Sequence, residues 1–328
     1  MTTTHGRQLL MNIPYPLTHQ FDDFEAFTEA VSGYDLEAQQ LERGLFSATS
    51  QQIVSGRVLL SHLTSTRCVE MRGSPPPKVR SFGIPTETCQ PFIWRNQYSD
   101  GNTIQLYRDV TELEIVTQPF FAAIDLSIPE DILNQQCQTL GLPELDDILG
   151  DNEMLTCDPD RMRPLRDTLR RVCRILSDDA SRINTVSMRR EIEDELPLLL
   201  LNALYSGKSQ QGYVHPRKRQ RALKKAVHYI RAFSKNSITL NQLCQEAQVS
   251  ARTLQHAFLD QYSLTPKAYL RVQRLNEAHK KLVTLSPLNT GVADIAHLSG
   301  FNHMGQFATD YRKLFGELPS ATLQRSGH

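Results

Sequence analysis

The sequence predicts an α+β protein with an N-terminal antiparallel β-sheet and helices, followed by an all-α part with two helix-turn-helix units. Three observations support this fold class. Short β-prone runs fill residues 51–129, apolar residues at helical spacing follow Pro129, and the last third of the chain contains one helical unit twice. A chain of 328 residues is long enough for two domains of ordinary size.

The composition is that of a globular protein with a sizeable core, with 40% apolar and 22% charged residues. The sequence has no run of about 18 apolar residues, so we expect no helix that spans a membrane. Its N-terminus lacks the basic and then apolar layout of a signal peptide. The six cysteines are scattered without C-x-x-C pairs, which favours reduced thiols. We therefore expect a cytoplasmic protein.

A net charge of zero hides a strong asymmetry. From Arg217 onward the chain has 17 Lys and Arg against 6 Asp and Glu, a net charge of +11. The remainder must therefore carry −11. A basic terminal third is typical of proteins that bind a polyanion such as DNA, although a solvated basic face is the simpler alternative.

The N-terminal region, residues 1–206, begins with an irregular segment. Phe21, Phe24, Phe27 and Val31 then recur at the spacing of an amphipathic helix. A change of period follows at residues 51–129, where short β-prone runs predict a small antiparallel sandwich or barrel.

Turn residues separate these predicted strands. The segment Gly73–Pro77 cannot continue a ladder of backbone hydrogen bonds, and Asp100–Asn102 is a hairpin signal. Aromatic residues of these strands could line an apolar pocket or fill the core. They are Phe92, Trp94, Tyr98, Tyr107 and Phe120.

Helical periodicity returns over residues 130–206. We expect one helix at Glu130–Leu142, a second with the apolar stripe Leu165, Leu169, Val172 and Leu176, and a third at Met188–Tyr205. Pro197 would kink or restart the third helix. Such stripes serve packing within the chain, or a helix pair could also form a dimer contact. The polar segment 207–216 is the predicted linker.

The predicted C-terminal domain, residues 217–328, contains the repeat. Its two copies align at an offset of 53 residues, which places Leu254 on Phe307. Each copy predicts a helix-turn-helix motif, at 239–262 and 291–315. Capping residues mark the helix starts, and the first recognition helix should bury Leu254, Phe258 and Leu259. In the second copy Gly300 supplies the backbone freedom for the bend.

These residues resemble the DNA-binding domain of AraC/XylS-family transcription regulators. The resemblance rests on VSARTLQHAF in the first copy, IAHLSGFNHMGQFATDYRKLFGELPSATL in the second, and PKAYLRVQRLNEAHKKL between them. SARTLQHAF and GQFATDY are most similar to the ethanolamine-operon regulator branch. The chain departs from that branch at Asn302, where an aromatic residue is common.

The resemblance implies several properties beyond the DNA-binding domain. Family members often carry a cupin-like sheet in the N-terminal domain, form homodimers, and act as activators that recruit RNA polymerase. Many respond to a small-molecule effector, and branch resemblance alone suggests ethanolamine or a cobalamin. The implied function is a regulator that binds specific sequences of double-stranded DNA.

Helix geometry and the resemblance together predict the DNA contacts. A recognition helix presents the exposed residues of its N-terminal half to base edges in the major groove. The predicted base-contacting residues are Arg252, Gln255, His256, Met304, Gln306 and Thr309. The predicted phosphate-contacting residues are Ser250, Thr253, His303, Arg312 and Lys313. Because the second copy lacks a basic residue on its base-facing side, we expect the first copy to provide more discrimination.

The connecting helix sets the distance between the two recognition helices. Thr265 caps it, Pro266 occupies its first turn, and Ser286–Pro287 ends it. A helix of about 19 residues is roughly 28 Å long, which is close to one turn of B-DNA at about 34 Å. One chain could then contact two successive major grooves, on an asymmetric site.

The sequence offers little support for an enzyme. The histidines His5, His19 and His62 are far apart in the N-terminal region, whereas metal sites need clustered ligands. There is also no G-x-S-x-G, phosphate-binding glycine loop or H-E-x-x-H motif. We expect no catalytic residues, no metal and no cofactor. The alternatives are a regulator without an effector, whose N-terminal domain only dimerises, and an enzyme with an accessory DNA-binding domain.

Overall fold

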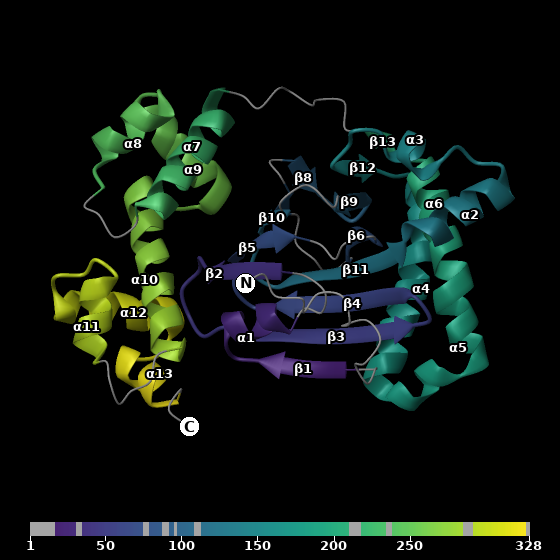
Figure 1. Ribbon diagram of the computed structural model, residues 1–328, viewed down its shortest axis with the longest axis horizontal. Coiled ribbons are helices and arrows are strands. Elements are labelled where there is room, and N and C mark those ends of the chain that lie inside the picture. Colours follow the sequence, from purple (N-terminus) through teal and green to yellow (C-terminus); the bar gives the residue numbers. More distant parts are fainter. Residues whose placement is uncertain are drawn as a thin grey trace, which may run out of the picture. The chain divides into compact units, whose positions relative to one another are not determined.

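A computed structural model of the chain describes residues 17–30, 35–74, 79–86, 92–94, 97–107, 113–209, 218–233, 238–284 and 291–325 (Figure 1). The chain forms two compact units. Unit 1 comprises Met1–Ala38, Ser47–Thr66 and Met71–Gln211, and unit 2 comprises Gln39–Phe46, Arg67–Glu70 and Gly212–His328. The predicted linker 207–216 lies mostly outside the described residues, so the predicted domain boundaries stay predictions.

The strands form two sheets. Their bounds are β1 Leu17–Phe21, β2 Asp35–Gln40, β3 Ala48–Ser55, β4 Val58–Ser65, β5 Val69–Ser74, β6 Val79–Pro85, β7 Phe92–Trp94, β8 Gln97–Ser99, β9 Thr103–Tyr107, β10 Leu113–Val116, β11 Phe121–Pro129, β12 Met154–Thr156 and β13 Lys208–Ser209. The larger sheet has the order β1-β3-β4-β11-β6-β9-β12-β13, with antiparallel pairing throughout. The smaller sheet has the order β2-β5-β10-β7-β8. With the all-α C-terminal part, these sheets confirm the predicted fold class.

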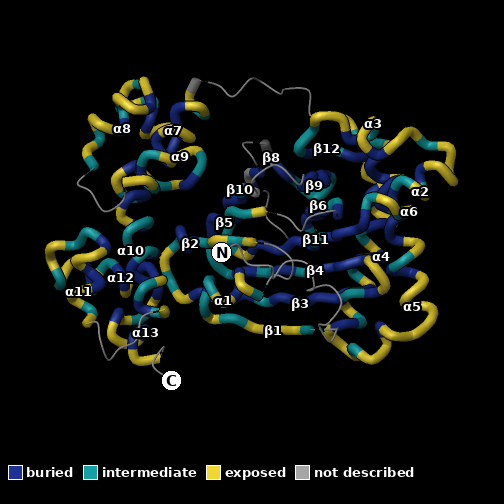
Figure 2. The backbone as a smooth tube through the Cα atoms, viewed as in Figure 1, coloured by how far each residue is buried: buried dark blue, intermediate teal, exposed yellow. Residues whose placement is uncertain are grey.

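Helices cover one face of the larger sheet in unit 1. They are α2 Glu130–Leu140, α3 Leu145–Leu149, α4 Pro159–Asp178, α5 Val186–Arg190 and α6 Leu196–Tyr205. The short helix α1 Phe24–Glu29 lies on the other face, where Gln52 Nε2 donates to the carbonyl of Ala30 at the end of α1 at 2.7 Å. The predicted stripe Leu165, Leu169, Val172 and Leu176 on α4 is buried in one apolar cluster with α6 and with residues of β3, β4, β6, β9 and β11. Figure 2 shows this burial as dark strands and exposed outer helix surfaces.

The third predicted helix is interrupted. A π-helical turn, Glu191–Glu195, separates α5 from α6, and Pro197 lies in the first turn of α6. Proline lacks a backbone N–H, so the first turn is where it costs least. The predicted restart of the helix at Pro197 is therefore present, and a wider π-helical turn precedes it.

Three sequence predictions in unit 1 and one in unit 2 need correction. Phe21 ends strand β1 instead of belonging to a helix, and β2 also forms within the first 50 residues. Helical spacing in so short a segment did not outweigh pairing with β3. β5 runs through Gly73 and Ser74, so pairing continues into the predicted break. Leu259, in unit 2, is 44% exposed and does not join the buried face.

The turn at Asp100–Asn102 is present but is no hairpin. The Asn102 N–H donates to Asp100 Oδ1 at 2.8 Å, and the Thr103 N–H donates to the Asp100 carbonyl at 3.2 Å. β8 before it belongs to the smaller sheet, whereas β9 after it pairs with β6 and β12 in the larger sheet. The turn therefore carries the chain from one sheet to the other.

Most of the aromatic pocket candidates belong to the core. Phe92, Trp94 and Tyr107 are at most 5% exposed, and the rings of Trp94 and Tyr107 lie 5.0 Å apart. Phe120 is 68% exposed and faces away from the interior, which contradicts its expected place along a pocket. The side chain of Tyr98 lies outside the described residues.

The C-terminal part of unit 2 is helical. Its helices are α7 Lys218–Ala232, α8 Leu240–Ala247, α9 Ala251–Tyr262, α10 Pro266–Thr284, α11 Val292–Leu298, α12 Met304–Phe315 and α13 Pro319–Arg325. The helix-turn-helix pairs are α8–α9 and α11–α12, and α10 connects them. Thr239 and Gln242 form the predicted capping box, and Gly300 has a positive φ of 82° at the second bend. The predicted end of α10 at Ser286–Pro287 lies outside the described residues.

Unit 2 also contains two short segments from early in the chain, Gln39–Phe46 and Arg67–Glu70. The first segment binds α10 through Asn276. The backbone N–H of Gln40 donates to Asn276 Oδ1 at 2.9 Å, and Asn276 Nδ2 donates to the Gln40 carbonyl at 3.0 Å. The buried amide of Asn276 thus pairs with an extended backbone as a neighbouring strand would.

The second segment contributes a buried carboxylate. Glu70 is 2% exposed and accepts hydrogen bonds from the hydroxyl of Tyr269 at 2.8 Å and from Arg231 Nη2 at 2.7 Å. The hydroxyl of Tyr262 lies 3.4 Å from the same carboxylate. Because a buried charge is stable only when paired, Glu70 ties α7, the end of α9 and the start of α10 together.

Candidate nucleic-acid interface

The first recognition helix, α9, starts at a capped serine. Ser250 Oγ accepts the backbone N–H of Thr253 at 3.3 Å, and the two hydroxyls lie 2.9 Å apart. Leu254 and Phe258 are fully buried on the opposite side of the helix. These contacts fix the start and rotation of α9, and they also show that both predicted phosphate-contacting hydroxyls already serve the cap.

The predicted base-contacting residues of α9 all lie on its exposed side. Arg252, Gln255 and His256 are exposed. In the part of the chain that the structure describes, no hydrogen bond or ion pair engages the side chains of Arg252 or Gln255. A guanidinium and a primary amide in this state are ready donors and acceptors for guanine and adenine edges.

The second recognition helix, α12, starts differently. His303 is its N-cap, but its side chain makes no capping hydrogen bond. Phe307 and Tyr311 bury the inner side of the helix. On the outer side Gln306 and Thr309 are exposed and Met304 is half-buried. Thr309 Oγ1 donates to the carbonyl of Gly305 at 2.8 Å, so this predicted base contact is engaged within its own helix.

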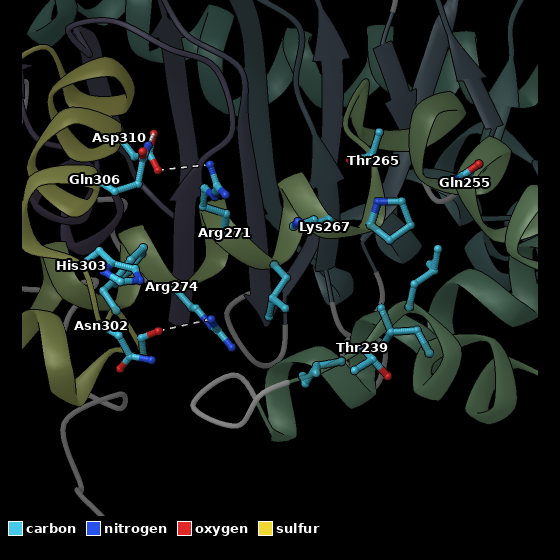
Figure 3. A pocket seen from close by; sticks show the side chains of 17 residues that line it. Thr239, Gln255, Thr265, Lys267, Arg271, Arg274, Asn302, His303, Gln306 and Asp310 are labelled. Carbon is cyan, nitrogen blue, oxygen red and sulfur yellow. Dashed lines mark hydrogen bonds and ion pairs between the residues drawn. The ribbon is translucent and has the colours of Figure 1, made fainter.

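The two helix-turn-helix motifs share a cavity of about 750 Å³ (Figure 3). Gln255 of α9 lines it together with His303 and Gln306 at the start of α12, so the structure brings together three predicted contact residues. The others lie outside this lining. They are Ser250, Arg252, Thr253, His256, Met304, Thr309, Arg312 and Lys313. Arg312 and Lys313 are exposed further along α12, as the phosphate prediction requires.

The connecting helix α10 contributes cations that the sequence reasoning missed. Lys267, Arg271 and Arg274 line the same cavity, and Figure 3 shows them between the two motifs. Their spacing of four and then three residues places them on one side of a helix, and this signal was available in the sequence. Arg274 Nη1 donates to the carbonyl of Gly300 at 3.3 Å, and burial lowers the pKa of its guanidinium.

Asp310 of α12 holds two residues of this surface. Its Oδ1 accepts Gln306 Nε2 at 2.8 Å, and its Oδ2 lies 3.2 Å from Arg271 Nη1. The carboxylate is 11% exposed, whereas the Arg271 side chain is 49% exposed. Figure 3 shows the contact between Asp310 and Arg271, with Gln306 beside Asp310. Asp310 therefore fixes the orientation of Gln306 and partly neutralises a cation that faces the cavity.

Comparisons with known proteins match the C-terminal part. The family described as "Helix-turn-helix domain" matches residues 243–325. The XylDLEGF operon transcriptional activator 2 of Pseudomonas putida is 35% identical over 124 residues, which are 38% of this chain and 77% of that protein. A solved structure of a probable AraC family transcriptional regulator from Rhodopseudomonas palustris is 36% identical, over 32% of this chain and 96% of that one, with a TM-score of 0.31. The chain belongs to the AraC/XylS family of transcription regulators.

This AraC/XylS-family chain shares less with longer relatives. The probable thc operon regulatory protein of Rhodococcus erythropolis is 36% identical over 99 residues, which are 30% of each chain. The chain thus spans about a third of the length of the first curated relatives that it matches. In the described residues, no helix is long and apolar enough to cross a membrane, and no group of three His, Cys, Asp or Glu side chains could hold a metal ion.

Proposed function

We propose that this protein is a transcription regulator that binds specific double-stranded DNA, and that it acts as an activator. One observation carries the proposal. Two recognition helices flank a single cavity, with Gln255 on one side, Gln306 on the other and the cations of α10 between them. An exposed polar rim around a basic floor suits base edges in two grooves and the phosphate backbone that joins them.

The length of α10 supports contact with two successive grooves. Its 19 residues span about 28 Å at the helical rise per residue, against about 34 Å for one turn of B-DNA. Because α9 and α12 differ in sequence, the site of one chain is asymmetric. All eleven predicted contact residues remain part of this proposal, with Arg252 and Gln255 as the main base contacts.

The test is selection of bound duplexes from a random pool and from genomic fragments, followed by affinity measurements over a range of salt concentrations. We expect one asymmetric motif to be enriched. Its affinity should fall steeply with salt, because each neutralised phosphate releases about one counterion. Arg312→Ala is the matched variant for phosphate contact, and it should lower the salt slope by about one on any sequence. Binding without an enriched motif would contradict sequence-specific regulation.

The role of the N-terminal part is the second half of the proposal. We propose that it senses a small molecule and forms a homodimer, and that the DNA-bound protein recruits RNA polymerase in the cytoplasm, without catalysis by this chain. SARTLQHAF and GQFATDY support the ethanolamine-operon branch, so ethanolamine and a cobalamin are the first effectors to test. The names of the relatives in Pseudomonas putida support activation.

A regulator without an effector is the alternative. The two cases differ in a titration of the whole protein with candidate metabolites, followed by DNA affinity and by oligomeric state in analytical ultracentrifugation. A ligand changes DNA affinity only through different affinities for the competent and incompetent states. If no metabolite changes DNA affinity while the protein remains a dimer, the N-terminal part is a dimerisation domain and the sensing proposal fails.

A further inference from the structure

The last two residues of strand β2 contact different helix-turn-helix motifs. They are Gln39 and Gln40, and both belong to unit 2. Neighbouring residues of a strand point to opposite sides. Gln39 Nε2 donates to the Glu70 carboxylate and, at 3.1 Å, to the hydroxyl of Tyr269, which lies at the start of α10 beside the first motif. Gln40 instead contacts the middle of α10 and the end of α12. Two consecutive residues thus bridge the two motifs.

The backbone of Gln40 holds the connecting helix α10. Its N–H and carbonyl both pair with the side-chain amide of Asn276, at 2.9 Å and 3.0 Å. Asn276 Nδ2 also donates to the carbonyl of Val272 in its own helix at 2.9 Å, which fixes the orientation of the amide. Gln40 and Asn276 are at most 5% exposed. Because a buried polar group without a partner is costly, this pairing keeps Gln40 at one place along α10.

The side chain of Gln40 holds the C-terminal end of the second recognition helix. Gln40 Nε2 donates to the carbonyl of Leu314 at 2.8 Å, and the backbone N–H of Gly44 donates to the same carbonyl at 2.9 Å. Leu314 is the last residue but one of α12, and the last four carbonyls of a helix have no partner within it. The upstream segment, Gln39–Phe46, therefore acts as a C-terminal cap of α12.

The loop that follows Gln40 is held close to the end of α12. Gln40 Nε2 also lies 2.6 Å from the carbonyl of Glu42 and 2.7 Å from that of Gly44, so its amide group closes the loop. Gly316, the C-cap of α12, has a positive φ of 81°, and a Cβ at this position would lie 2.7 Å from Leu45 Cγ. The loop therefore cannot shift along α12 without breaking these contacts.

These contacts bear on the distance between the two recognition helices. Helix α10 is the element that both motifs share, and a cavity of about 750 Å³ lies between them (Figure 3). We propose that Gln40 positions α12 relative to α9 by joining the end of α12 to the middle of α10, and that it thereby fixes the spacing between the two halves of the DNA site. Gln40 is 1% exposed, so it acts through the helices and not by contacting DNA. This inference rests on the proposed DNA-binding function and adds a residue that determines its spacing.

The experiment measures affinity of the full chain for a set of related duplexes. The first is the asymmetric site enriched by selection, the next two have one base pair inserted or removed between its halves, and the last keeps only the half contacted by α9. One base pair moves the second half by about 3.4 Å along the axis and by about a tenth of a turn around it. The wild-type protein should bind the altered spacings at least about tenfold more weakly, because both helices cannot then dock together.

Gln40→Ala should weaken binding to the enriched site by about tenfold and reduce the preference for its spacing to about threefold or less, because a looser connection lowers the effective concentration of the second helix. Affinity for the α9 half alone should stay unchanged. Asn276→Ala should give the same result from the α10 side of the bridge. Gln40→Glu should act more strongly, since it places a carboxylate oxygen against three carbonyls. Arg43→Ala is the control, because this side chain is exposed on the same loop and its loss should leave the spacing preference unchanged.

Circular dichroism must show folded variants, and Gln40→Ala carries the test if Gln40→Glu does not fold. An unchanged spacing preference in Gln40→Ala and Asn276→Ala would overturn the inference. Equal losses on the complete site and on the α9 half would also overturn it, since they would show a general loss of stability. These failures differ from failure of the proposed function. A wild-type protein without a two-part site would refute contact with two grooves, whereas a two-part site whose spacing survives in both variants would refute only the role of Gln40.

Discussion

The two recognition helices have the same length and the same buried side, but their outer sides differ. Each has 12 residues, and Leu254 of α9 and Phe307 of α12 occupy the same repeat position, fully buried. At the repeat position of Arg252, α12 has Gly305, since both pairs are 53 residues apart. The duplicated scaffold has therefore kept its packing while the DNA-facing side chains have diverged.

The helices also differ in how their outer side chains are held. On α9, the side chains of Arg252 and Gln255 make no hydrogen bond or ion pair with other described residues. On α12, Asp310 accepts a hydrogen bond from Gln306, and Thr309 donates one to the carbonyl of Gly305. Ser250 caps α9 with its side chain, but His303 makes no such bond to α12. The first helix thus has a capped start and outer side chains that are available for contacts, which supports the prediction that it provides more of the sequence discrimination.

Polar ties inside the two motifs differ as well. In the second motif, the hydroxyl of Tyr311 lies 2.7 Å from His279 Nδ1 and 2.9 Å from Thr322 Oγ1, and the upstream segment contributes Gln40 Nε2, which donates to the Leu314 carbonyl of α12 at 2.8 Å. The first motif uses another upstream residue of unit 2, the carboxylate Glu70, as the partner of Tyr262 and Tyr269. Loss of that carboxylate should therefore affect one motif much more than the other.

The largest expected effect is that of Glu70→Ala. This substitution leaves Arg231 without its carboxylate in a buried network, which should cost about 3–5 kcal/mol of stability. Hydrogen exchange should show lost protection in α9 and the first half of α10, with α12 and α13 still protected. Arg325→Ala is the control in the second motif, where loss of the ion pair between Glu317 and this 49% exposed arginine should cost about 1 kcal/mol or less. A uniform loss across both motifs would contradict the unequal ties.

The next effect concerns base discrimination by α9. Arg252→Ala or Gln255→Ala should cost about 1–3 kcal/mol on the selected site and little on random duplexes, because a bidentate contact to a base edge is lost. Competition binding with both duplexes at one salt concentration measures this. Equal losses of affinity on both duplexes would mean that Arg252 and Gln255 contact phosphate. The proposed difference in base discrimination between α9 and α12 would then be wrong.

The helices and turns of the two helix-turn-helix motifs were predictable from the sequence. Caps such as Thr239 and Ser250, the bend at Gly300 and the buried Leu254 all follow from local patterns, and the structure confirms them. A duplicated motif constrains each copy through the other, which is why the repeat was informative. The β-sandwich was predictable as a class for a similar reason, because short alternating runs need little long-range information.

Pairings between distant residues were not predictable. Nothing near Glu70 in the sequence indicates that it meets Tyr269, almost 200 residues later. The role of Asp310 depends on the placement of α10 against α12, because its carboxylate contacts Arg271 of α10. Local propensity also failed at Phe21, where pairing with β3 overrode helical spacing.

Asp310→Asn should make the surface around α12 more like that around α9, because fewer of its side chains would be held by contacts within the protein. The variant keeps an acceptor for Gln306 but loses the charge that holds Arg271, so Arg271 should become available to phosphate. Affinity for random duplexes should rise by about 1 kcal/mol, and the salt slope by about one. Arg271→Ala in the same background should remove both gains. If Asp310→Asn weakens random binding, the carboxylate supports the helix instead of restraining a cation.

The smallest expected effect comes from Gly305, where the repeat has lost its arginine. A Cβ added at Gly305 would meet no atom within 4 Å, so Gly305→Ala should gain helix propensity without strain. The expected stabilisation is below the helix-interior value of about 0.8–1 kcal/mol, because Gly305 lies in the first turn of α12, and denaturant unfolding measures it. Gly305→Arg should keep part of this gain and add a guanidinium at the position that Arg252 has in α9. Duplex selection with this variant should then enrich a guanine in the half of the site contacted by α12, since arginine pairs with guanine O6 and N7. Gly305→Lys is the control for charge alone, because it should raise affinity without a new base preference. An unchanged motif with Gly305→Arg would mean that this side of α12 does not face the bases, and the difference between the two helices would then lie in docking and not in the side chains they carry.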